Sequence, residues 1–206
     1  MTDLTAQELG AEALAPDDPA WNAAEAVRVP LVPVPVDAQP NAYIRAAWHD
    51  RSYGATPSAS VAVATHGDRL FVRLEWDGSG PVAGEFPDAC AVLFPAGDGP
   101  DTPVTMGDHA SPVEVWQWRD RLPVQEAIPA VRHLVSTGPG MFRPGAADAD
   151  LAAAATVDGT RWSVVLAGPR SALGAPARVA VAVWNGANEE RAGIGAVSDE
   201  WAAVQA

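Results

Sequence analysis

Residues 60–76 read Ser60-Val-Ala-Val-Ala-Thr-His-Gly-Asp-Arg-Leu-Phe-Val-Arg-Leu-Glu-Trp76, and this stretch decides the fold. Val61 and Val63 alternate with small residues, and Gly67-Asp68 is a turn dipeptide. After the turn, large apolar side chains recur at every second position: Leu70, Val72, Leu74 and Trp76. This alternation is typical of antiparallel strands with one buried face. The stretch therefore predicts a β-hairpin.

Further strands are predicted on both sides of this hairpin. Residues 152–157 and 160–166 flank the turn dipeptide Asp158-Gly159 and predict a second hairpin. The apolar run 89–94 predicts a strand buried on both faces, and 178–184 predicts another strand. In 113–118, the two valines would point to one face and the two tryptophans to the other. Many short strands with turn signals between them predict an all-β fold, mainly an antiparallel β-sandwich with a few short helices.

The remaining segments carry weaker signals. Residues 1–15 are expected to be a flexible lead, with a weak acidic helix or disorder over 5–14. Residues 29–36 alternate proline with valine and leucine, which predicts an edge strand or an extended segment. Residues 41–58 and 136–147 are expected to be loops. Helical spacing over 121–134 is broken by two prolines, and a short helix is expected over 199–204.

Composition limits the class of protein. The 206 residues, 48% hydrophobic and 19% charged, predict one globular domain over 1–206. A net charge of −13 argues against nucleic acid or an anionic membrane as a partner. The single cysteine, Cys90, excludes an internal disulfide and an iron–sulfur site made by this chain. With neither a signal-peptide pattern nor a membrane-span pattern, the chain is expected to be cytoplasmic, or periplasmic if it is exported with a partner.

Catalytic motifs are absent from the sequence. It contains no Gly-x-Ser-x-Gly elbow, no nucleotide-binding glycine loop and no His-x-x-x-His or Cys-x-x-Cys pair. Its four histidines are scattered along the chain. We therefore expect a protein that is not an enzyme by itself.

Residues 105–119 carry the most specific pattern: Met106-Gly107-Asp108, then Pro112-Val113, then Trp116-Gln-Trp118-Arg119. This pattern resembles the haem-binding signature of the haem b (gamma) subunits of type II DMSO-reductase-family molybdenum enzymes. Blocks similar to others of that family follow one another in order, so the resemblance spans nearly the whole chain, roughly residues 15–201. The other blocks lie at 70–77, 86–95, 158–165 and 181–186.

The resemblance implies a β-sandwich with haem b at one edge and Met106 as an axial iron ligand. Aromatic side chains near the signature would wall the macrocycle: Phe94, Trp116, Trp118 and Trp184. Arg119 and Arg73 are the candidates by position for binding the propionates, and His109 lies three residues after Met106. A methionine sulfur favours ferrous iron and raises the reduction potential.

The sequence departs from the family at the second axial ligand. The family has a lysine there, whereas this chain has Gly195 and contains no lysine at all. Three alternatives follow: a substitute ligand such as His109 or, less favoured, Met141; an open or water-filled position; or no haem.

The resemblance implies an electron-transfer subunit that relays electrons between an iron–sulfur (beta) subunit and an external carrier. A molybdopterin catalytic (alpha) subunit would complete a heterotrimer. Two rivals stay open at this point. One is a haem-free docking subunit of such a complex, and the other is a stand-alone sandwich that binds carbohydrate or another small ligand.

Overall fold

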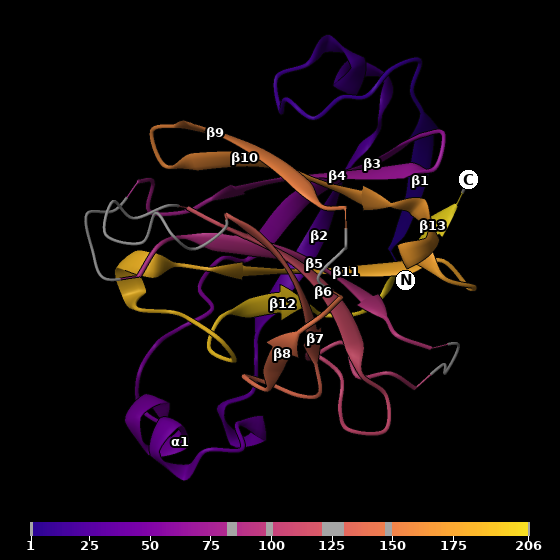
Figure 1. The fold of residues 1–206 in the computed structure, drawn as a ribbon. Helices are drawn as coiled ribbons and strands as arrows, with labels where there is room; N and C mark the ends of the chain where they lie inside the picture. The colour runs from indigo at the N-terminus through magenta and orange to yellow at the C-terminus, as the bar shows by residue number, and fades with distance from the viewer. Residues whose placement is uncertain (1, 82–85, 98–100, 121–129, 147–149, 206) are drawn as a thin grey trace.

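The computed structural model describes residues 2–81, 86–97, 101–120, 130–146 and 150–205, and it consists mainly of two packed antiparallel layers (Figure 1). The first layer contains, in spatial order, β3 (Ser58–His66), β4 (Arg69–Asp77), β10 (Arg161–Pro169) and β9 (Ala152–Asp158). The second contains β11 (Arg178–Trp184), β5 (Ala89–Pro95), β6 (Val113–Arg119), β7 (Val131–Ser136) and β8 (Phe142–Pro144).

Four further strands join the two layers along one side: β1 (Asp3–Glu8), β2 (Ala26–Pro33), β12 (Ala196–Ser198) and β13 (Ala202–Gln205). β1 runs parallel to β13 with its first half and parallel to β3 with its second half. β2 pairs with β3 and then with β12. β12 and β13 both pair with β11 of the second layer, so β1 with β13 and β2 with β12 each make a link from β3 to β11. The two layers therefore form one continuous sheet, and the chain termini lie close together (Figure 1).

Helical structure is confined to short segments. α1 (Ala42–Trp48) begins after Asn41, whose side chain accepts a hydrogen bond from the Tyr43 amide. Four 3₁₀ helices complete the described elements: η1 (Pro19–Ala23), η2 (Val36–Ala38), η4 (Arg170–Leu173) and η5 (Gly186–Asn188). No helix in the described ranges combines the length and the apolar character needed to cross a membrane.

The predicted all-β fold is confirmed, and so are its main strands. The first hairpin pairs Ser60 with Glu75 and His66 with Arg69, which leaves Gly67-Asp68 as the turn. β9 and β10 form the second hairpin, and β5, β6 and β11 occupy the predicted runs. The alternation in β6 is confirmed as well, because its valines and tryptophans belong to different clusters.

Six local predictions are wrong. The loop expected at 136–147 contains the short strand β8, which pairs with β7. Residues 3–8 form β1 instead of belonging to a helix or a disordered lead, and 202–205 form β13 instead of a helix. Residues 131–134 lie in β7, while 121–129 lie outside the described residues. Residues 26–33 form a strand with partners on both sides, not an edge strand, and the loop expected at 41–58 contains α1. Except in α1 and β8, pairing with a strand distant in sequence overrides the local signal.

Three apolar clusters make up the core. The inner cluster lies between the layers and contains the side chains of β3, β4 and β10 on one side and of β5, β6 and β11 on the other. A second cluster packs the N-terminal segment, with Trp21, onto the far face of the β3–β4–β10 layer. The third, which we call the outer-face cluster, covers the far face of the β5–β6–β11 layer and contains Met106 and Trp184. Met106 of the predicted signature therefore lies on an outer face of the sandwich.

Candidate functional site

Met106 lies in a tightly hydrogen-bonded turn that precedes β6. The Gly107 amide donates to the Pro103 carbonyl (2.8 Å), and the Asp108 carboxylate accepts from the amides of Ala110 and Ser111. The Ser136 hydroxyl, at the end of β7, donates to the Met106 carbonyl (2.9 Å). These bonds hold Met106 at a φ of 73°, a left-handed conformation that non-glycine residues rarely adopt. Such a conformation costs on the order of 1 kcal/mol and persists only where its surroundings enforce it.

The turn directs the Met106 side chain into the outer-face cluster, where it is 1% exposed. The neighbouring strands contribute mainly small side chains to this face: Ala89 and Ala91 from β5, and Ala180 and Ala182 from β11. The register places Ala91 opposite Ala182 and Ala89 opposite Trp184. The thioether is thus buried in a cluster that combines these alanines with valine and leucine side chains and the Trp184 indole.

Gly195 occupies the position where the resemblance places a lysine ligand. A Cβ atom at residue 195 would lie 2.6 Å from Cδ1 and 2.8 Å from Nε1 of Trp184. The indole is fixed in place because its Nε1 donates to the Ala192 carbonyl (2.9 Å). No side chain fits at residue 195 without displacing Trp184.

The other predicted site residues are dispersed. Trp116 and Trp118 point into the inner cluster, on the opposite face of β6 from Met106. Arg119 lies on the same face as the outer-face cluster, whereas His109 is exposed on the turn. Arg73 lies on β4, stacked over the Trp21 ring at 5.0 Å. The structure therefore brings Met106 and Arg119 to one face and leaves the tryptophans of the signature in the core.

The remaining predicted site residues also lie in different parts of the fold. Phe94 packs against Trp116 in the inner cluster, with ring centroids 4.7 Å apart. Trp184 belongs to the outer-face cluster. Met141 is 42% exposed and lines a groove of about 340 Å³ between α1 and the 139–141 and 191–194 segments.

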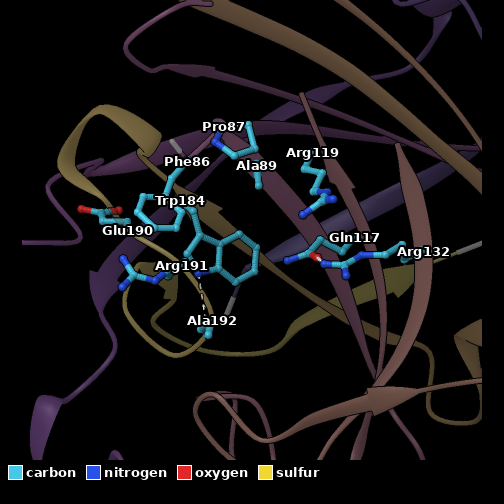
Figure 2. Close-up of a pocket in the computed structure, with 10 residues that line it drawn as sticks. All are labelled: Phe86, Pro87, Ala89, Gln117, Arg119, Arg132, Trp184, Glu190, Arg191 and Ala192. Atoms are coloured by element: carbon cyan, nitrogen blue, oxygen red, sulfur yellow. Dashed lines mark hydrogen bonds between the residues drawn. The ribbon is translucent and has the colours of Figure 1, made fainter. Parts of the chain in front are cut away.

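The outer face ends at a second cavity, of about 240 Å³, which we call the arginine cavity (Figure 2). It contains three guanidinium groups, a glutamine amide and two aromatic rings, supplied by Arg119, Arg132, Arg191, Gln117, Trp184 and Phe86. An Nη of Arg132 donates to the Gln117 side-chain oxygen across the β6–β7 ladder. In Figure 2, the Arg119 guanidinium and the Gln117 amide point toward the same space beside Trp184.

Burial lowers the pKa of both Arg119 and Arg132, and the nearby charge of Arg119 lowers the pKa of Arg132 further. Both groups stay protonated at neutral pH, so the cavity holds two mutually repelling charges. Sequence reasoning missed Arg132 because residues 121–134 had helical spacing. Only the β6–β7 register places it opposite Gln117.

For a haem, the residues present offer only part of a binding set. Met106 carries a soft thioether, although it is 1% exposed, and Arg119 and Arg132 carry cations suited to carboxylates. The position opposite Met106 has no ligating side chain at Gly195. The described part of the chain also contains no cluster of three His, Cys, Asp or Glu side chains suited to a metal ion.

Comparison with known proteins gives three relatives, and no protein-family model matches. The chain is 34% identical to a putative respiratory nitrate reductase heme subunit from Haloferax mediterranei, covering 90% of this chain and 66% of that protein. It is 35% identical to the chlorate reductase subunit gamma of Ideonella dechloratans, covering 69% and 62%. It is 26% identical to the dimethylsulfide dehydrogenase subunit gamma of Rhodovulum sulfidophilum, covering 90% and 72%. The chain thus spans a little under two thirds of the first two relatives.

Proposed function

Because this chain belongs to the gamma-subunit family of type II DMSO-reductase-family molybdenum enzymes, we propose that it serves as an electron-transfer subunit of such a complex. Its relatives, a putative heme subunit of a nitrate reductase and the gamma subunits of a chlorate reductase and a dimethylsulfide dehydrogenase, support this role. The substrate chemistry would belong to a molybdopterin (alpha) subunit. This chain would pass electrons between an iron–sulfur (beta) subunit and an external carrier.

The proposal extends to a b-type haem for which Met106 is the protein ligand. The observation that carries it is the left-handed φ of Met106, because a strained non-glycine residue is retained where its side chain must be aimed. Ser136 and Pro103 hold the backbone of the turn, so the thioether has a set direction. A bound haem would supply single-electron exchange, and a methionine ligand favours its ferrous form.

The chain does not supply the second axial ligand in the family's way. Gly195 packs on Trp184, and His109 is exposed on the turn whereas Met106 is buried. If haem is bound, we therefore expect Met106 to be its one protein ligand. An iron held in this way would be high-spin, whereas a second ligand from His109 would make it low-spin.

One observation favours a second candidate function, a haem-free docking subunit of the same kind of complex. The Met106 side chain is 1% exposed within the outer-face cluster and lines neither the arginine cavity nor the α1 groove. In this alternative Met106 is a packing residue. The two candidates differ in whether the purified complex contains haem.

The deciding experiment measures the optical and EPR spectra of the complex co-expressed with its partners. Met106→Leu keeps the side-chain volume, so we expect the protein to fold, with an altered haem spectrum or reduced haem content. Met141→Leu, on the exposed loop, is the matched control and should leave the spectrum unchanged. His109→Ala should also leave it unchanged. A haem spectrum that is unaffected by Met106→Leu would refute the ligand assignment, and a complex without haem would favour the docking subunit.

We further propose that the contact with the iron–sulfur subunit involves the Met106 turn and the 186–198 segment. Electron transfer requires a short path from the partner to the outer face, and these two segments border that face. Cross-links from residues near Asp108 or Arg191 to the iron–sulfur subunit would support this arrangement. Cross-links only from the β9 edge would contradict it.

A further inference from the structure

The arginine cavity gathers positive charge in an acidic protein. The protein carries a net charge of −13, yet two guanidinium groups line this one cavity, close enough for the charge of Arg119 to lower the pKa of Arg132. Arg119 and Arg132 form no ion pair with any described residue. Like charges that are partly buried without a counter-charge destabilise a fold unless something else compensates for them.

Arg132 also has an unpaired donor. Its Nε–H is buried and has no hydrogen-bond partner among the described residues, although one Nη is bound to Gln117. A buried donor without a hydrogen-bond partner reduces the stability of the fold by roughly 1–3 kcal/mol, so native proteins rarely leave such a donor unsatisfied. The Gln117 oxygen is already an acceptor for Arg132, so its amide N–H₂ is directed toward the cavity (Figure 2).

The one carboxylate that lines the cavity does not neutralise these arginines. Both oxygens of Glu190 accept hydrogen bonds from its own surroundings, from the amides of Gly54 (2.7 Å) and Asn185 (3.0 Å). The Asn188 side chain adds a third bond at 3.1 Å. Arg191 lies over the Phe86 ring at 4.1 Å and donates to a backbone carbonyl. Among the described residues, none supplies an acceptor for the Arg132 Nε–H or a counter-charge for the two arginines.

We propose that the arginine cavity binds a small oxyanion or a carboxylate group, held by Arg119, Arg132 and the amide of Gln117. Planar guanidinium groups match the geometry of carboxylates and phosphates. The Trp184 ring and Ala89 form an apolar wall and floor beside these donors, so an anion with a flat apolar body also fits the lining.

Two sources can supply this chemistry. One is a free anion. The other is the carboxylates of a haem bound on the outer face, and this second possibility rests on the proposed function. Binding of a free anion does not depend on haem, so a protein that binds no haem would refute the proposed function without refuting the anion site.

The test uses the full chain and inorganic phosphate as the probe, with isothermal titration at constant ionic strength. We expect saturable binding with one phosphate per chain. Arg119→Gln should weaken it by about tenfold or more, because a hydrogen bond to a charged group is lost. Arg132→Gln should weaken it similarly. The control, Arg161→Gln, removes the same charge from the β4–β10 surface and should leave the affinity unchanged.

The unfolding temperature of Arg119→Gln is informative even in the absence of phosphate. It removes the repulsion with Arg132, so the variant should unfold at the same or a higher temperature than the wild type. Phosphate should raise the unfolding temperature of the wild type and not that of the variant. An absence of saturable binding to the wild type, or an equal loss in Arg161→Gln, would overturn the proposal.

A second titration distinguishes the sources, comparing haemin with its dimethyl ester, which lacks the carboxylates. If Arg119→Gln weakens haemin binding and not ester binding, the haem carboxylates occupy the site. If it weakens phosphate binding and leaves both haem forms unaffected, the ligand is a free anion. If it changes none of the three, the site does not exist.

Discussion

At the scale of single residues, a close contact, and not a turn conformation, explains why residue 195 is a glycine. Its missing Cβ leaves room for the Trp184 indole, which an added carbon would approach to 2.6 Å. We expect Gly195→Ala to reduce the free energy of unfolding by about 1–3 kcal/mol, because the indole must move. Urea denaturation measures the change. Gly10→Ala, where nothing lies within 4 Å, is the control, and equal effects of the two substitutions would contradict the contact.

Asp88 is a buried hydrogen-bonding centre between the layers. Its carboxylate accepts from the Trp162 indole (2.8 Å) and from the amides of Gly186 (2.7 Å) and Ser79 (3.2 Å), and the residue is 1% exposed. Asp88→Ala leaves three donors unpaired and should destabilise the fold by about 3 kcal/mol or more. Asp88→Asn keeps one oxygen and should cost less. Denaturation curves test this order, with the exposed Asp158→Ala expected to be nearly neutral.

At the scale of elements, β1 decides how firmly the two layers are joined. Its Leu4 is 2% exposed in the inner cluster, and its neighbours pair with β13 and then with β3. We expect Leu4→Ala to cost about 2–5 kcal/mol through the cavity it leaves. Hydrogen exchange should report lost protection in β1 and β13 well before β6 and β7. Uniform loss across all strands would mean that β1 is not a separate cooperative unit.

A matched substitution on β9 tests whether the effect of Leu4→Ala is specific to its place in the fold. Val157 is 37% exposed at the hairpin end, so Val157→Ala removes two methyl groups that are already in contact with water. Its effect should stay within about 0.5 kcal/mol. A comparable loss in both variants would contradict the role assigned to β1.

At the scale of the whole molecule, net charge influences stability. A charge of −13 on a folded chain of 206 residues repels itself, and the repulsion weakens when salt shortens the Debye length to about 10 Å at 0.1 M. We expect the unfolding temperature at pH 7 to rise with sodium chloride from low to moderate concentration. Near pH 4.5, the isoelectric point of the sequence, the rise should largely disappear. A salt effect of equal size at both pH values would contradict this cause.

The parts of the fold that were predictable from the sequence are local. The hairpin of β3 and β4 needs only the alternation from Val61 to Trp76 and a turn dipeptide, all within 16 consecutive residues. The same holds for the two faces of β6, since alternation along one strand separates Val115 from Trp116. The Met106 turn was recognisable from its turn-forming residues and its resemblance to a known signature.

Other elements have no such local signal. β1, β7 and β13 exist because distant strands supply their hydrogen bonds: Leu4 pairs with Val204, and Arg132 with Gln117. A short segment with weak propensity takes the conformation that its partners impose, so reading it alone predicted a helix or disorder. The two arginines of the proposed anion site meet only through this β6–β7 register.

By itself, the sequence determined the all-β class, the main hairpins, the family and the absence of a lysine ligand, because each follows from residues adjacent in the chain or from residue identity. Only the tertiary structure decided that the signature tryptophans lie in the inner core, that Gly195 is closed off by Trp184, and that Arg119 and Arg132 share one cavity. These are contacts between separate strands and loops. Their distances depend on register and layer packing, and no pattern along the chain encodes them.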